Sequence, residues 1–202
     1  MSRTLFTSRD GGDLKLPANR EFLKRSLSLS TLHFMHQTHS DVVRTTDATG
    51  DNFECDAMVT ATPGVGLAAL AADCMPITFT SETVVGVAHV GRLGLGSQIA
   101  IKTVAAMRHL GAINIFATIG PSICSNCYEV SPEMYREFIV RIPQSSTSDL
   151  RHSLNLQRGV RAQLLEVGVS VEDLAICTLE NPDYFSYRRG GEPARQAGII
   201  SL

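Results

Sequence analysis

Short apolar runs of strand length dominate residues 57–90, and this feature constrains the fold more than any other. The runs lie at residues 57–61, 66–72, 75–80 and 84–89. Turn-forming residues separate them, among them Pro63-Gly64 and Ser81-Glu82-Thr83. Strands this close along the chain favour antiparallel or mixed pairing over repeated βαβ units. We therefore expect a mixed sheet built largely from neighbouring strands.

The remaining predicted elements include helices in the second half of the chain. We predict further strand-like stretches at residues 32–43, 114–119, 174–178 and 198–202. Apolar stripes of helical period predict helices over 97–110 and 154–167. Ser131-Pro132-Glu133 is typical of a helix start, because it combines a capping hydroxyl, a proline at the first helical position and an acid at the positive helix end.

Composition limits the class of protein. The chain has 202 residues, with 18 basic and 20 acidic side chains and a formal net charge of −2, which argues against a dedicated nucleic-acid binder. A hydrophobic share of 44% is typical of a globular protein. The most apolar stretch, residues 65–72, is less than half the roughly 20 residues that a membrane helix needs. No secretory signal opens the sequence, so we expect a cytoplasmic protein without a membrane or nucleic-acid partner.

The five cysteines cannot all be paired in disulfides, and in a reducing cytoplasm such residues are more often ligands, nucleophiles or core residues. Cys74 follows Asp73 inside an apolar region. It is either a thiolate that binds a metal or attacks a substrate, or a small hydrophobic residue in a turn. Cys124 and Cys127 form a C-x-x-C motif, but no other two cysteines have this spacing. We interpret this motif mainly as one without a functional role.

Histidines and arginines supply the other candidates. His33, His36 and His39 lie close together in sequence, and each alone is more typical of an ordinary surface or core histidine. His89 ends an apolar run before a glycine-rich turn, which matches neither the Walker nor the dinucleotide-binding pattern. The segment Tyr187-Arg188-Arg189 is either a site for an anionic or planar ligand or an exposed basic turn.

Taken in chain order, these motifs resemble the YfiH family, also called the laccase-domain or polyphenol oxidase family. The matching segments are residues 6–12, 36–39, 72–76, 88–91, 119–123, 127–130, 177–178 and 185–189. Each match is weak alone, and the set is specific because it keeps its order over most of the chain. The resemblance implies a single YfiH-like domain over residues 1–202, of the α+β class, with mixed β-sheets in α-β-β-α layers.

The resemblance also implies a metal site on His39, Cys74 and His89. Two imidazoles and one thiolate suit Zn²⁺, with a fourth position left for water or substrate, and copper is the other metal that such donors bind. The three residues are too far apart in sequence for a local zinc knuckle. We therefore expect loops or strand ends to converge on the metal.

The resemblance further implies activity on a small-molecule nucleoside with phosphate. The implied reactions are phosphorolysis of adenosine, inosine or methylthioadenosine, and deamination of adenosine. Cys74 and His89 would then serve catalysis as well as metal binding. The candidates for binding the phosphate and the base are Arg9, Arg92, Tyr187, Arg188 and Arg189. Bacterial relatives have also been linked to editing of peptidoglycan precursors, which is an alternative function.

The chain departs from the family pattern near these residues. The family's Ala-His-x-Gly-Trp-Arg-Gly motif has no tryptophan here, and its arginine stands one place early, at Arg92. Ser40 and Gly190 replace a usual glycine and a usual aspartate, while Arg195 matches a later family arginine. The chain is also shorter than typical members, mostly between residues 12 and 19. These changes motivate an alternative in which the protein binds nucleosides without turnover.

Two other chemistries compete with a zinc enzyme. A cysteine hydrolase would use Cys74 as a nucleophile activated by His89. A multicopper laccase would need many histidines in H-x-H pairs, whereas this chain has six histidines and no such pair. We therefore reject electron transfer through a copper cluster.

Overall fold

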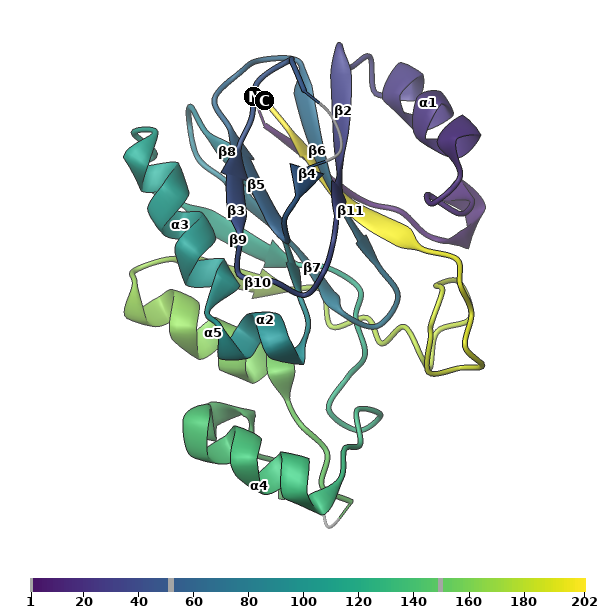
Figure 1. Cartoon of the computed structure of the whole chain (residues 1–202), viewed down its shortest axis with the longest axis vertical. Coiled ribbons are helices and arrows are strands. Elements are labelled where there is room, and N and C mark those ends of the chain that lie inside the picture. The colour runs from purple at the N-terminus through teal and green to yellow at the C-terminus, as the bar shows by residue number, and fades with distance from the viewer. Residues whose placement is uncertain (1, 51–52, 149–150) are drawn as a thin grey trace.

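Two stacked β-sheets form the centre of the protein, and the computed structural model describes them through residues 2–50, 53–148 and 151–202 (Figure 1). Within these residues the first sheet has five strands, in the order β1 (Arg3–Phe6), β11 (Gln196–Ser201), β6 (Val65–Ala71), β2 (Thr31–His36) and β4 (Phe53–Glu54). The strands β1, β11 and β6 pair antiparallel, whereas β2 runs parallel to β6 and to β4. The first sheet is therefore mixed.

The second sheet is also mixed. Its strand order, within the described residues, is β10 (Ser170–Asp173), β9 (Phe116–Ile119), β7 (Met75–Thr80), β8 (Val85–Val90), β5 (Ala57–Thr60) and β3 (Val43–Thr45). The strands from β9 to β5 pair antiparallel, and β10 and β3 add parallel edges. Mixed pairing is thus confirmed, but β6 and β7 belong to different sheets. The Asp73-Cys74 turn moves the chain from one sheet to the other.

Helices cover the outer faces and complete the predicted α-β-β-α layers (Figure 1). On the first sheet, α1 (Pro17–Ser26) lies beside β2. The helices on the side of the second sheet are α2 (Arg92–Gly96), α3 (Ile99–His109), α4 (Pro132–Arg141) and α5 (Leu156–Glu166). Short 3₁₀ turns occur at Arg9–Gly11 and Pro143–Ser145. The α+β class is confirmed.

Alternation along the strands divides the apolar core into layers. On β8, Val85 and Val87 pack with Leu67 of the first sheet, whereas Ala88 and Val90 belong to the cluster formed with the helices. Successive side chains of a strand point to opposite faces, so position 89 shares the inter-sheet face with Val85 and Val87. The histidine at that position consequently lies at the end of the apolar layer between the sheets.

Local signals explain where two of the helices begin. The Ser131 hydroxyl accepts a hydrogen bond from the Met134 amide at 3.2 Å, with proline at the first position of α4. The helix start expected at Ser131 is therefore confirmed. For α5, the Asn155 side chain accepts a hydrogen bond from the Arg158 amide at 2.8 Å. Both caps satisfy amides that have no partner inside the helix.

One predicted strand is wrong, and one predicted helix has a short neighbour that was not predicted. The strand expected over 174–178 is wrong: β10 ends at Asp173, and Ala175 has a φ of 54°, which interrupts an extended chain. The helix expected over 97–110 is confirmed as α3, and Gln98, with a φ of 62°, separates it from the short helix α2 that precedes it. Left-handed residues at these positions are local breaks that an apolar pattern does not reveal.

Neither β1 nor α1 was predicted from the sequence. No residue of α1 is buried, Leu23 packs only partly against the apolar cluster on the first sheet, and Phe22 is 68% exposed, so this mostly polar helix gives a weak apolar signal. No helix within the described residues is long and apolar enough to cross a membrane.

Candidate metal centre

Three distant segments place His39, Cys74 and His89 together. His39 lies in the loop after β2, Cys74 in the turn between β6 and β7, and His89 near the end of β8. Their ligand atoms all lie within 4.8 Å of one another, and the Cys74 Sγ to His39 Nε2 distance is 3.9 Å. The two imidazole rings meet edge to face with centroids 4.8 Å apart. We call these residues the histidine–cysteine centre.

A buried carboxylate orients His89. The Nδ1 atom of His89 lies 2.8 Å from Oδ1 of Asp56, and the two side chains are 5% and 0% exposed. A hydrogen bond from Nδ1 to the carboxylate leaves Nε2 available to the centre, which is the usual arrangement of carboxylate, histidine and metal. Burial lowers the pKa of His89, but hydrogen bonds to Asp56 and Cys74 outweigh this and raise it to about 9.

The same carboxylate fixes the loop that carries His39. Oδ2 of Asp56 accepts hydrogen bonds from the amides of Thr38 and Ser40 at 3.2 and 2.6 Å, and from the Ser40 hydroxyl at 2.7 Å. His39 between them has a φ of 59°, a conformation that needs such support in a residue other than glycine. The serine that replaces the usual family glycine thus adds a hydrogen bond. Burial raises the pKa of Asp56, but hydrogen bonds from His89 and Ser40 outweigh this effect and lower the pKa to about 2.

The space around Cys74 suits a bound ion. A Cβ atom at Gly91 would lie 2.9 Å from Cys74 Sγ and 3.4 Å from His39 Cδ2, so only glycine leaves room beside the sulfur. Burial raises the pKa of the Cys74 thiol, but His39 and His89 lower it more, from 9.0 to about 6. Two imidazoles and a readily ionised thiol are the donors that zinc prefers. The residues of the centre therefore fit the implied metal.

Asp73 positions the Cys74 turn. Its backbone has a φ of 91°, and its carboxylate accepts hydrogen bonds from the Thr178 hydroxyl at 2.7 Å and the Arg188 amide at 2.8 Å. The Asp73 carbonyl also accepts a bond from the Ile123 amide at 2.9 Å. The carboxylate anticipated at this position thus acts as an anchor between the turn and the C-terminal segment.

A cavity of about 690 Å³ opens onto the centre. The side chains lining it include Cys74, the tyrosines Tyr128 and Tyr187, and cations. The cationic residues are Lys15, Arg20, Arg188 and Arg195. The Arg188 guanidinium donates to the Glu129 carbonyl at 3.1 Å and lies 5.0 Å from the Tyr128 ring centroid. Fixed cations beside aromatic surfaces suit a ligand with an anionic part and a planar part.

The predicted substrate-binding residues divide into separate groups. Tyr187 and Arg188 line the cavity, and Arg92 approaches it through Tyr128. Burial raises the pKa of the Tyr128 hydroxyl, and the charge of Arg92 opposes that rise. Arg9 instead pairs with Glu192 at 2.6 Å, outside the lining of the cavity.

Arg189 also lies outside the cavity lining. Its guanidinium donates to the backbone carbonyls of Thr178, Leu179, Asn181 and Tyr184. These bonds use the donors that a phosphate would otherwise accept. A role for Arg9 or Arg189 in substrate binding stays a prediction, and both groups are engaged within the protein.

Sequence reasoning did not single out Asp56, Lys15 or Arg20. Asp56 is the most informative omission, because a fully buried aspartate must have partners. It stands directly before β5, and its burial follows only from the packing of the sheets. Lys15 and Arg20 belong to the region around α1, a helix without buried residues.

Comparison with known proteins now assigns the family. Residues 6–202 match the family described as "Multi-copper polyphenol oxidoreductase laccase". The chain belongs to this family. A Streptomyces griseus relative named purine nucleoside phosphorylase is 40% identical over 198 residues, covering 92% of this chain and 80% of the relative. A Corynebacterium glutamicum protein of the same name is 35% identical, covering 99% of this chain and 94% of its own.

Solved structures of this family share the fold. A Neisseria meningitidis protein superposes with a TM-score of 0.87 at 29% identity, covering 100% of this chain and 94% of its own. The Bacillus licheniformis hypothetical protein YfiH gives a TM-score of 0.86 at 25% identity, covering 100% and 92%. The resemblance to the YfiH family is confirmed.

Proposed function

We propose that this protein is a cytoplasmic zinc-dependent enzyme that acts on purine nucleosides. The reactions are phosphorolysis of adenosine, inosine or methylthioadenosine, and deamination of adenosine. The observation that carries the proposal is the histidine–cysteine centre at a cavity lined with cations and tyrosines. Relatives named purine nucleoside phosphorylase support the substrate class.

His39, Cys74 and His89 would hold the zinc ion. A zinc ion bound by three protein ligands supplies Lewis acidity and favours deprotonation of water at the open position. The chain's own contribution is the fixed arrangement of the ligands, since Asp56 holds His89 and the loop of His39 together. Copper is the competing metal, because the same donors bind it.

The cationic residues would bind phosphate for phosphorolysis. In that reaction a phosphate oxygen bonds to the anomeric carbon of the ribose, the glycosidic bond breaks, and its electron pair leaves with the purine. Arg188 is held by the Glu129 carbonyl beside the cavity, so its charge is in place before phosphate arrives. Tyr128 and Tyr187 offer planar faces for the base.

Deamination would use the same nucleoside with water in place of phosphate. Water adds to the purine carbon that carries the amino group, and ammonia leaves after that group gains a proton. One cavity that admits a nucleoside beside the centre serves both reactions. Phosphate dependence then separates them, because only phosphorolysis consumes phosphate.

The test is a turnover assay on the purified protein with adenosine, inosine and methylthioadenosine, each with and without phosphate. We expect adenine or hypoxanthine only with phosphate, and inosine from adenosine without it. Cys74→Ala should lose the metal of the centre and all turnover, while Cys55→Ala, at a buried cysteine that is not one of the three residues of the centre, should keep both. Turnover by metal-free protein would overturn the proposal.

A cysteine hydrolase with Cys74 as nucleophile and His89 as its base is the second candidate. The ligand atoms of Cys74 and His89 lie within 4.8 Å of each other, which favours it. This enzyme would keep its activity after chelation and would form a covalent adduct at Cys74 with a substrate-like electrophile. Zinc and nucleoside binding without any product would instead indicate a non-catalytic relative. The metal-dependent assay thus separates all these functions.

A further inference from the structure

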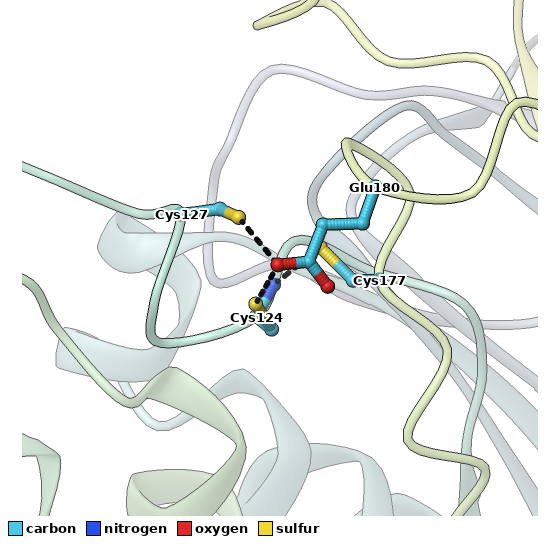
Figure 2. Close-up of side chains that lie close together, drawn as sticks. All are labelled: Cys124, Cys127, Cys177 and Glu180. Atoms are coloured by element: carbon cyan, nitrogen blue, oxygen red, sulfur yellow. Dashed lines mark hydrogen bonds between the residues drawn. The ribbon is translucent and has the colours of Figure 1, made fainter.

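A second group of metal-ligand side chains lies where the loop after β9 meets the segment after β10 (Figure 2). Its members are Cys124, Cys127, Cys177 and Glu180. The three sulfur atoms and a carboxylate oxygen all lie within 4.8 Å of one another. We call this group the cysteine–glutamate cluster. The cluster is separate from the residues that line the large cavity.

The side chains point toward a common centre, as Figure 2 shows. Oε1 of Glu180 lies 3.3 Å from the sulfur of Cys127 and 3.9 Å from that of Cys124. Four donors around a tetrahedral zinc ion with Zn–S bonds of about 2.3 Å lie about 3.8 Å apart. The donors of the cluster thus already have nearly the separations that zinc requires.

The spacing of the four residues is typical of a structural zinc site. Cys124 and Cys127 form a C-x-x-C pair, and Cys177 and Glu180 form a matching C-x-x-E pair. The sequence alone shows no second pair of cysteines at this spacing, and the C-x-x-C motif was therefore interpreted as one without a functional role. The fold supplies the second pair with a carboxylate in place of one thiol, and carboxylate oxygen is an accepted zinc ligand.

Backbone hydrogen bonds fix both pairs. The amide of Cys127 donates to the Cys124 carbonyl at 3.1 Å, and the amide of Asn181 donates to the Cys177 carbonyl at 2.9 Å. The two segments are joined by a bridge between Ser122 and Cys177. The Cys124 amide also donates to the Cys177 sulfur at 3.4 Å, a contact that stabilises a thiolate.

Arg189 supports the Glu180 side of the cluster. Its guanidinium donates to the carbonyls of Leu179 at 3.0 Å and Asn181 at 2.8 Å, on either side of Glu180. This holds the turn and places a positive charge beside a group that becomes strongly negative when its thiols ionise. Such outer contacts are the usual supports of metal ligands.

We propose that the cysteine–glutamate cluster binds a structural zinc ion. Three thiols would each release a proton to solvent as zinc binds, and the carboxylate would complete a closed set of four ligands. The ion would join the loop before Tyr128 to the segment before Arg188. Tyr128 and Arg188 both line the cavity. The cluster would thereby stabilise the wall of the active site without contacting the substrate.

Zinc content is the direct test, with full-length protein purified under reducing conditions. We expect about two equivalents in the unmodified protein and about one in Cys74→Ala, which lacks only the histidine–cysteine centre. Adding Cys177→Ala to Cys74→Ala should remove the remaining zinc, whereas adding Cys55→Ala should not. Cobalt in place of zinc should give thiolate-to-cobalt absorption in Cys74→Ala that Cys177→Ala abolishes.

Glu180→Gln tests the fourth ligand in a variant that keeps every thiol. In the Cys74→Ala background, we expect zinc affinity to fall by at least about 10-fold in competition with a chelator. Zinc-free Cys74→Ala protein that shows no rise in melting temperature on adding zinc would overturn the proposal. A disulfide among the three cysteines that persists in protein purified under reducing conditions, found by mass spectrometry, would also overturn it.

Discussion

The histidine–cysteine centre and the cysteine–glutamate cluster show two ways in which one fold gathers side chains that can bind a metal. The centre takes His39, Cys74 and His89 from three distant segments, and its open side faces a cavity. The cluster takes its donors as two closely spaced pairs from turns with their own backbone hydrogen bonds. An incomplete donor set beside a cavity suits reaction with a substrate, whereas a closed set suits stability.

The two sites also differ in the residue that supports them. A buried carboxylate, Asp56, supports the centre from behind and holds the two histidine-bearing segments. Arg189 supports the cluster through backbone carbonyls of the turn that carries Glu180. Changes near Asp56 should therefore affect metal and turnover together, while changes near Arg189 should affect stability first.

Gly91→Ala should have the largest effect of these variants, and it should affect the histidine–cysteine centre but not the cluster. The new Cβ would stand 2.9 Å from Cys74 Sγ, so the sulfur must move. Displacement of a reacting group by about 1 Å costs about 100-fold in rate, and we expect a loss of that order in phosphorolysis. The zinc of the cluster should remain.

Gly96→Ala is the matched control for that experiment. Position 96 also lies in the segment after β8, but a Cβ there meets its nearest atom at 3.8 Å, an ordinary contact. We expect this variant to keep turnover and both zinc ions. Equal activity of the two alanine variants would show that the sulfur of Cys74 has no fixed position in the reaction.

Asp56→Asn should weaken the metal at the centre by about 10- to 100-fold, as removal of a carboxylate behind a metal-bound histidine usually does. The amide cannot offer a charged acceptor to the Ser40 amide and hydroxyl. Zinc competition with a chelator measures this change. Asp41→Asn, at an exposed acid that pairs with Lys102, should leave the affinity unchanged.

The sequence predicted the fold best where strands are apolar and turns are short. Residues 75–80 correspond to β7 as predicted, because their pattern is strong and local. The strand expected at 174–178 failed because its break depends on the left-handed Ala175. The α1 helix was not predicted because it is mostly polar: Leu23 packs only partly against the apolar cluster on the first sheet, and no residue of the helix is buried.

The candidate site was predictable only in part, for a similar reason. His39, Cys74 and His89 were identified through a family resemblance, and the fold brings them together. Asp56 has no motif of its own, and only its burial reveals its importance. The partnership between Cys124 and Glu180 depends on where β9 and β10 end side by side, which no spacing along the chain encodes.

Two neighbouring arginines belong to different regions. Arg188 lines the cavity, whereas Arg189 donates hydrogen bonds to the turn that carries Glu180 of the cluster. Arg188→Met should raise the KM for phosphate by about 10-fold, since a hydrogen bond to a charged group contributes about 1.5–3 kcal/mol. Arg189→Met should instead lower the free energy of unfolding by about 1–3 kcal/mol, because several partly buried carbonyls lose their donor.

Steady-state kinetics and urea unfolding of both arginine variants distinguish the two roles. The expected result is a change in KM without a large change in stability for Arg188→Met, and the reverse for Arg189→Met. A larger effect of Arg189→Met on the KM for phosphate would place Arg189 among the substrate-binding residues, as its chemistry predicted from the sequence.

Thr178→Val should give the smallest effect and test whether the two regions are coupled. Thr178 follows Cys177 of the cluster, and its hydroxyl donates to the Asp73 carboxylate, directly before Cys74. Valine would leave a buried carboxylate oxygen without this donor, which costs about 1–3 kcal/mol of stability. Turnover should fall only a few-fold, because the Arg188 amide still holds the other oxygen.

A double-mutant cycle combines Thr178→Val with Glu180→Gln, and Thr178→Ser, which keeps the hydroxyl, is the control. If the cluster supports the cavity wall through Thr178, the two changes will reduce turnover by less together than the product of their separate effects. Independent effects would mean that zinc in the cluster stabilises only its own loops. In that case the Asp73 anchor, rather than the cluster, would set the position of the Cys74 turn.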